Sequence, residues 1–135
     1  KNRVKIKDKN INIIPFINKN TKNGEKLISN YLVNTHFHIL FSNAEAYGIS
    51  LIEANSRGVP NICFNVGGIP SVVKNDTNGK VFKQNQNLNK IAEYIYKIFI
   101  NKKKYKKLAL SSYKYFYNNY RYDKIIDRFI YLIKK

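Results

Sequence analysis

Two glutamates with a glycine between them, Glu45, Gly48 and Glu53, suit the binding of a phosphorylated ligand. The first N–H groups of a helix lack internal partners and lie at the positive end of its dipole. A helix starting here would present the amides of Tyr47, Gly48 and Ile49 to an anion such as a diphosphate. Gly48 has no Cβ, so a ligand can approach its backbone closely. Glu53, farther along the helix, is placed to accept hydrogen bonds from a vicinal diol such as a ribose.

The surrounding pattern predicts the elements that would position these residues. Residues 37–41 form a short apolar run, typical of a buried strand, and residues 42–47 are polar, typical of a loop. An apolar segment follows and ends at a Gly-Val-Pro sequence, residues 58–60, which is a helix stop. Residues 61–66 favour a second buried strand. Glu45 would therefore lie at the carboxyl end of a strand, where open α/β sheets bind ligands.

The rest of the chain continues the alternation of strands and helices, which predicts a parallel sheet. The other predicted elements are strands at residues 11–17 and 80–82, a helix at 24–34, a short helix or turn at 69–74, and amphipathic helices with apolar stripes at 88–99, 105–116 and 122–133. A basic run, residues 102–107, is expected to separate the first two of these amphipathic helices.

Residues 45–53, Glu-Ala-Tyr-Gly-Ile-Ser-Leu-Ile-Glu, resemble the Glu-x7-Glu motif of the retaining GT-B glycosyltransferases of family 4, also called glycosyl transferases group 1. The Gly-Val-Pro at 58–60 and the Val-Gly-Gly-Ile-Pro at 66–70 follow at the family's spacings, and residues 75–79 look like its next turn. The resemblance is clear over residues 12–82. It implies an α/β fold: a partial Rossmann-like parallel sheet flanked by helices, the second half of a GT-B enzyme, with a helical C-terminal tail.

The resemblance also implies a function and a set of site residues. The family transfers a sugar from a nucleotide-activated donor to a carbohydrate or lipid-linked acceptor with retention, as in polysaccharide biosynthesis. Glu45 would be the catalytic residue that orients the donor sugar. The implied donor-binding residues are Ala46, Tyr47, Gly48, Ile49, Glu53, Gly67 and Gly68. No cofactor is implied, and no His or carboxylate cluster has the spacing of a metal site, so we expect no metal.

Each of these residues also has a purely structural interpretation. Glu45 can cap the following helix, because acids are favoured near a helix N-terminus. Gly48 can serve only to permit a turn, and Gly67 and Gly68 can form a tight turn without touching a ligand. Glu53 can be a solvated carboxylate on a helix surface.

The basic composition supports a second kind of function. The sequence has 25 Lys and Arg against 8 Asp and Glu, a formal net charge of +17. One interpretation of this charge is compositional bias. The other is that the chain is a non-catalytic module that binds a polyanion or an anionic membrane surface. The second interpretation predicts salt-dependent binding that does not depend on Glu45 or Glu53. The tyrosines between Tyr113 and Tyr122 could stack bases, but their spacing favours packing against the sheet, so we expect no nucleic-acid partner.

The domain organisation follows from the same patterns. Residues 1–120 are expected to form the partial donor-binding domain, and residues 121–135 an amphipathic helix. That helix carries Lys124, Arg128, Lys134 and Lys135, which suit a peripheral contact with an anionic membrane. The single Cys63 fits a reducing compartment, so we expect a cytoplasmic protein. Because the chain contains no Met, we interpret it as part of a longer enzyme that is inactive without its acceptor domain and its basic diphosphate clamp.

Overall fold

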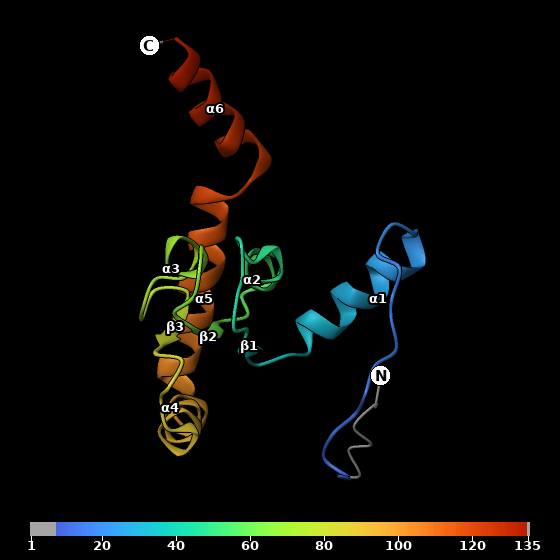
Figure 1. Cartoon of the computed structure of the whole chain (residues 1–135). Coiled ribbons are helices and arrows are strands. Elements are labelled where there is room, and N and C mark those ends of the chain that lie inside the picture. The colour runs from blue at the N-terminus through green and yellow to red at the C-terminus, as the bar shows by residue number, and fades with distance from the viewer. Residues whose placement is uncertain (1–7, 135) are drawn as a thin grey trace.

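The computed structural model describes residues 8–134 and contains a three-stranded parallel sheet (Figure 1). The strands are β1 (His38–Leu40), β2 (Asn61–Phe64) and β3 (Gly79–Phe82), in the order β1-β2-β3. His38 lies opposite Asn61, and Asn61 lies opposite Gly79. Parallel neighbours require crossover connections, which short helices provide here. The predicted fold class, an α/β chain with a partial Rossmann-like parallel sheet flanked by helices, is confirmed.

Six helices accompany the sheet within residues 8–134. They are α1 (Lys22–Val33), α2 (Ile49–Ser56), α3 (Ile69–Val72), α4 (Leu88–Ile100), α5 (Lys102–Asn119) and α6 (Tyr122–Ile133). Helix α2 connects β1 to β2, and α3 connects β2 to β3. The long helix α5 packs against both α2 and α4. All the helices expected from the apolar stripes are therefore present, because each stripe has the 3.6-residue period of a helix face.

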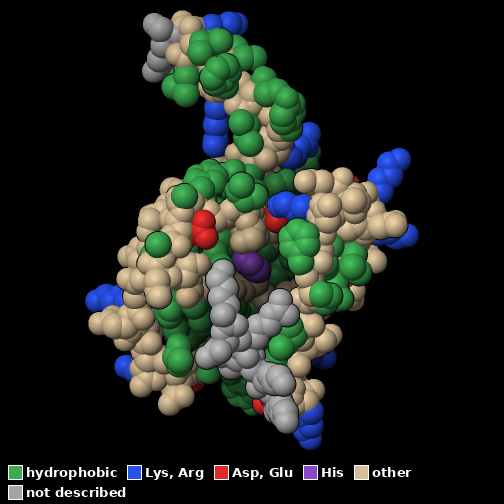
Figure 2. Space-filling model, turned by 45° about the vertical axis from the view of Figure 1, so that its right-hand side comes forward, with side chains coloured by type: hydrophobic (Ala, Val, Ile, Leu, Met, Phe, Trp, Pro, Cys, Tyr) green, Lys and Arg blue, Asp and Glu red, His purple; other side chains and the backbone are tan. Residues whose placement is uncertain are grey.

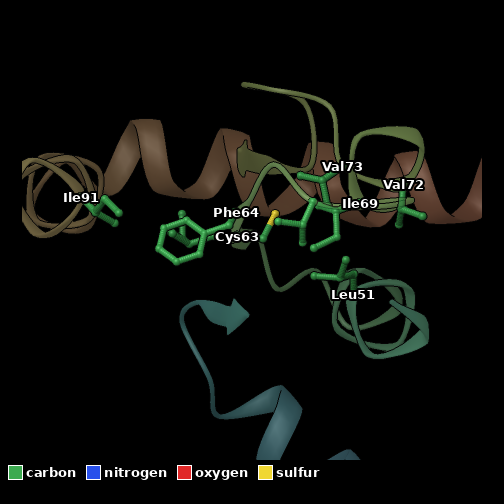
Figure 3. Close-up of a cluster of buried hydrophobic side chains, with 9 residues drawn as sticks. Leu51, Cys63, Phe64, Ile69, Val72, Val73 and Ile91 are labelled. Carbon is green, nitrogen blue, oxygen red and sulfur yellow. The ribbon is translucent and has the colours of Figure 1, made fainter. Parts of the chain in front are cut away.

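The core lies around β2, the middle strand. All four residues of β2 are buried, and Ile62 and Cys63 are fully inaccessible. Side chains from α2, α3 and α4, among them Leu51, Ile69 and Ile91, converge on this strand (Figure 3). A strand covered on both sides is largely apolar, which is why a buried strand was predicted at residues 61–66, although β2 ends at Phe64.

The prediction of a strand at residues 11–17 is wrong. The segment forms neither helix nor strand, and Ile13 and Phe16 are 64% and 93% exposed. A strand needs a neighbour to complete its backbone hydrogen bonds, and within residues 8–134 no strand pairs with this segment. Pro15 also removes a backbone donor from the segment.

The basic run at residues 102–107 is not a linker but the first turns of α5. Asn101 caps the helix, because its side-chain oxygen accepts a hydrogen bond from the backbone N–H of Lys104 at 3.0 Å. This cap, which sequence reasoning missed, lets the helix begin directly after α4 and include all the lysines.

Helix α6 leaves its apolar stripe uncovered. None of its residues is buried, and Tyr122 and Phe129 are 81% and 63% exposed. The helix projects from the end of α5 away from the sheet (Figure 1), and its apolar side chains lie open on the surface (Figure 2). None of the helices within residues 8–134 is both long enough and apolar enough to span a bilayer.

The expected packing of the tyrosines against the sheet is right for one of them. Tyr120 packs against the core, whereas Tyr113 and Tyr117 are 44% and 43% exposed. The ring of Tyr117 instead lies under the guanidinium of Arg121, 4.3 Å from its centroid. Arg121 and Tyr120 lie where α5 ends and α6 begins, so these aromatic contacts brace the junction of the two helices.

Cys63 provides a first test of the core. Burial raises the pKa of its thiol to about 12, because the interior disfavours the thiolate. We expect slow labelling of the folded chain by a thiol reagent at pH 8, since the thiolate is the nucleophile. The stabilisation from keeping the thiol neutral is complete below its unfolded pKa, about 8.5, and is lost as the pH rises towards 12. Urea unfolding at pH 8 to 11 should therefore show a smaller alkaline loss of stability in Cys63→Ala, and equal losses would contradict the prediction.

Candidate functional site

Gly48 forms the entry to α2 and adopts a conformation that favours glycine. Its φ and ψ are 79° and 60°, in the left-handed region, and a Cβ there would lie 2.5 Å from Cδ1 of Leu51. The backbone N–H of Gly48 donates to Oε1 of Glu45 at 3.2 Å. Glu45 therefore caps α2 in this structure, and Gly48 permits the turn. Both structural interpretations hold, and both residues lie at the carboxyl end of β1.

The turn after β2 lies directly against this loop. A Cβ on Gly67 would collide with the backbone oxygen of Glu45, and one on Gly68 with that of Ala46. The backbone N–H of Gly68 also donates a hydrogen bond to the backbone oxygen of Glu45, at 3.2 Å. Only residues without side chains allow the two backbones to approach so closely. The fold thus brings four of the predicted site residues together at the carboxyl edge of β1 and β2.

Tyr47 and Ile49 complete the entry to α2, and their side chains are 46% and 64% exposed. Burial raises the pKa of Tyr120 well above its usual range, and the neighbouring hydroxyls of Tyr47 and Tyr115 raise it further. Tyr47 therefore lies beside Tyr120, at the junction of α5 and α6. Sequence reasoning missed this link, because the two residues are far apart in the chain and no local pattern pairs them.

Glu53 lies in a different setting, on the face of α2 that looks towards α1. Its carboxylate accepts a hydrogen bond from the Lys19 ammonium at 2.6 Å, and its side chain is 40% exposed. It lines a cavity of about 340 Å³ between the two helices, together with residues that include Lys19, Asn20, Glu25, Ser56 and Arg57. Neither Glu45 nor the Gly67–Gly68 turn lines this cavity. The structure therefore separates Glu53 from the cluster around Gly48.

Three buried asparagines hold α2 in place, and sequence reasoning missed all of them. The side chain of Asn78 donates to Oδ1 of Asn55 at 2.8 Å, and that of Asn55 donates to the backbone oxygen of Val59 at 2.9 Å. Asn61 on β2 donates to the backbone oxygen of Leu51 at 2.9 Å. These bonds connect the helix that carries Glu53 to β2 and to the turn before β3. In so Asn-rich a chain no local signal distinguished them.

His38 belongs to this polar network and not to the site. Its Nδ1 lies 2.9 Å from Oδ1 of Asn61, at the amino end of β1. His38 therefore has a structural role, in joining β1 to β2. Among residues 8–134, no three His, Cys, Asp or Glu side chains lie close enough together to hold a metal ion.

Comparison with known proteins gives the family. A search of curated proteins found no match. A family model described as "Glycosyl transferases group 1" matches residues 7–115, most of the chain, including both glutamates and both glycine turns. The chain therefore belongs to the glycosyl transferases group 1 family.

Proposed function

We propose that this chain binds the donor in the transfer of a sugar from a nucleotide-activated donor to a carbohydrate or lipid-linked acceptor, with retention, as in polysaccharide biosynthesis. The observation that carries the proposal is the meeting of the Glu45–Ala46 loop with the Gly67–Gly68 turn at the carboxyl ends of β1 and β2. That edge is where open α/β sheets bind ligands, and the family membership supports glycosyl transfer.

The diphosphate of the donor would bind at the amides of Tyr47, Gly48 and Ile49. The Gly48 N–H has one hydrogen to donate, and Glu45 accepts it in this structure. An incoming phosphate oxygen would replace the carboxylate, which then turns towards the donor sugar and orients it. The amides and the helix dipole would stabilise the negative charge that develops on the leaving diphosphate. Ala46, Gly67 and Gly68 would line the pocket for the donor sugar.

The Glu53 carboxylate would accept hydrogen bonds from the two hydroxyl groups of the ribose. Its ion pair with Lys19 is partly exposed, and exposed ion pairs contribute only about 0–1 kcal/mol. A diol can therefore replace the ammonium at small cost. Glu53 and Gly48 would thus contact two different parts of one nucleotide, the ribose and the diphosphate.

No metal or other cofactor is part of the proposal, because the helix amides supply the positive end of a dipole to the diphosphate. We place the protein in the cytoplasm, with a peripheral contact at the inner face of the membrane. The buried free thiol of Cys63 supports a reducing compartment. We propose no nucleic-acid partner.

The test is the affinity of the chain for uridine- and guanosine-diphosphate sugars, measured by calorimetry. We expect Glu53→Gln to weaken binding about ten- to a hundredfold, because a hydrogen bond to a charged group contributes roughly 1.5–3 kcal/mol. Glu25→Gln is the matched control, since Glu25 lines the same cavity from α1 but lies outside the motif.

Equal affinities for the wild type and Glu53→Gln would remove Glu53 from the site. Binding that disappears with salt but is insensitive to both Glu45→Gln and Glu53→Gln would favour the alternative, a non-catalytic polyanion-binding module.

A further inference from the structure

The corner between α4 and α5 exposes an apolar face that the donor-binding site does not use, and the inference drawn from it rests on the peripheral membrane contact proposed above. Tyr96, Phe99 and Ile100 occur at the i, i+3, i+4 spacing that places side chains on one helix face. They are 62%, 49% and 57% exposed. Residue 101 then ends α4, and α5 begins at once. We call residues 96–107 the α4–α5 corner.

Five lysines occur in the first two turns of α5, directly after the apolar residues of α4 in the chain. They are Lys102, Lys103, Lys104, Lys106 and Lys107. No acidic residue occurs anywhere in α5, and the only acid in α4, Glu93, is paired with Lys97 at 2.6 Å. Cations at a helix N-terminus are disfavoured by the helix dipole, so helix stability does not explain their position. An anionic partner would favour this position.

Apolar and basic groups also share a cavity at this corner. The cavity is about 320 Å³ and is lined by His36, Phe99, Ile100, Lys102, Tyr105 and Lys106. The rings of His36 and Phe99 meet edge to face, with centroids 5.0 Å apart, and the Tyr105 hydroxyl donates to the backbone oxygen of His36 at 3.2 Å. These contacts hold His36, Phe99 and Tyr105 together, so aromatic rings and two lysines line the same cavity.

We infer that the α4–α5 corner docks onto an anionic lipid bilayer. Exposed apolar side chains beside lysines match the boundary between acyl chains and anionic headgroups. RNA fits less well, because the corner contains no arginine, the side chain that suits bidentate phosphate recognition and stacking.

Helix α6 is less suited to this contact, although its apolar face is open. Its basic residues alternate with acids: Arg121 pairs with Asp123 at 3.0 Å, and Lys124 lies 3.8 Å from Asp127. The corner and α6 lie at opposite ends of α5 (Figure 1), so their contributions can be separated by mutation.

The position of the corner also leaves the candidate site free. His36, part of the corner's cavity, precedes the amino end of β1, whereas Glu45 follows its carboxyl end. A bilayer at the corner would therefore lie at the edge of the sheet opposite to the Glu45 loop.

The experiment is flotation of the full chain with vesicles of phosphatidylglycerol and phosphatidylcholine, against vesicles of phosphatidylcholine alone. We expect binding only to the anionic vesicles. One lysine near such a surface changes the partition coefficient about fivefold, so replacing all five with Gln should reduce it by about a hundredfold or more. The control variant has the same net charge, because five lysines elsewhere are replaced with Gln: Lys9, Lys22, Lys26, Lys83 and Lys90. Its binding to anionic vesicles should fall far less.

A second variant, Tyr96→Ser with Ile100→Ser, tests the apolar part without changing charge. It should weaken vesicle binding at least tenfold while the circular dichroism spectrum stays unchanged. Equal losses for the two five-lysine variants would overturn the proposal, because only net charge would then matter. Binding to a single-stranded RNA 20-mer that needs the five corner lysines, without binding to anionic vesicles, would also overturn it.

Discussion

Replacing Gly67 with alanine is expected to destabilise the chain by about 2–5 kcal/mol. Gly67 has a φ of 48°, and the left-handed conformation costs other residues roughly 1–2 kcal/mol. The new Cβ would also collide with the backbone oxygen of Glu45, and such overpacking costs a further 1–3 kcal/mol, roughly. The Glu45–Ala46 loop must move to relieve the collision, so affinity for the donor should fall as well. Urea unfolding followed by circular dichroism measures the first effect, and calorimetry the second.

Gly58→Ala is the matched control for this substitution. Gly58 also has a positive φ, 71°, but the nearest atom to a new Cβ, the backbone oxygen of Ala109, lies 3.3 Å away. The control therefore carries the conformational cost without a severe collision, and we expect a loss of about 1–2 kcal/mol. Equal losses in the two variants would mean that the contact between Gly67 and the Glu45 loop has no energetic importance.

Replacing Asn78 with alanine is expected to cost about 3–5 kcal/mol of stability. The side chain is fully buried and makes three hydrogen bonds: it donates to Asn55 Oδ1 and to the Val72 oxygen, and it accepts from the Lys74 N–H at 2.6 Å. Each buried partner left without a hydrogen bond costs about 1–3 kcal/mol, and the deleted atoms leave a cavity. Urea denaturation at neutral pH gives the value.

Asn75→Ala is the control in the same turn. Asn75 is exposed, and its side chain accepts one hydrogen bond, from the Val81 N–H at 2.8 Å. A single exposed hydrogen bond contributes about 0.5–1.5 kcal/mol, so this variant should lose much less. The double variant Asn55→Ala, Asn78→Ala should destabilise by less than the sum of the single variants, because the two side chains share a bond. Strict additivity would show that they act independently.

The sequence alone determined the elements whose signals are local. The apolar run before Glu45, the helix stop at Gly58 and Pro60 and the stripes of the last three helices each depend on neighbours within a few residues. Such patterns specify which face of a strand or helix is apolar before any tertiary contact forms. The Glu-x7-Glu motif and the glycine turns likewise pointed to the glycosyl transferases group 1, the part of the resemblance that the family model confirms.

Only the tertiary structure decided how these elements meet. Gly67 lies against Glu45 because β1 and β2 are adjacent in the sheet, and no local pattern encodes that contact. The same holds for the buried bond between Asn55 and Asn78 and for the pairing of Glu53 with Lys19, which join distant segments. Within the described part of the chain, residues 8–134, no strand pairs with the strand-like sequence at 11–17, and no residue of α6 is buried. Periodicity specifies an apolar face, but burial of that face requires a partner that other parts of the fold must provide.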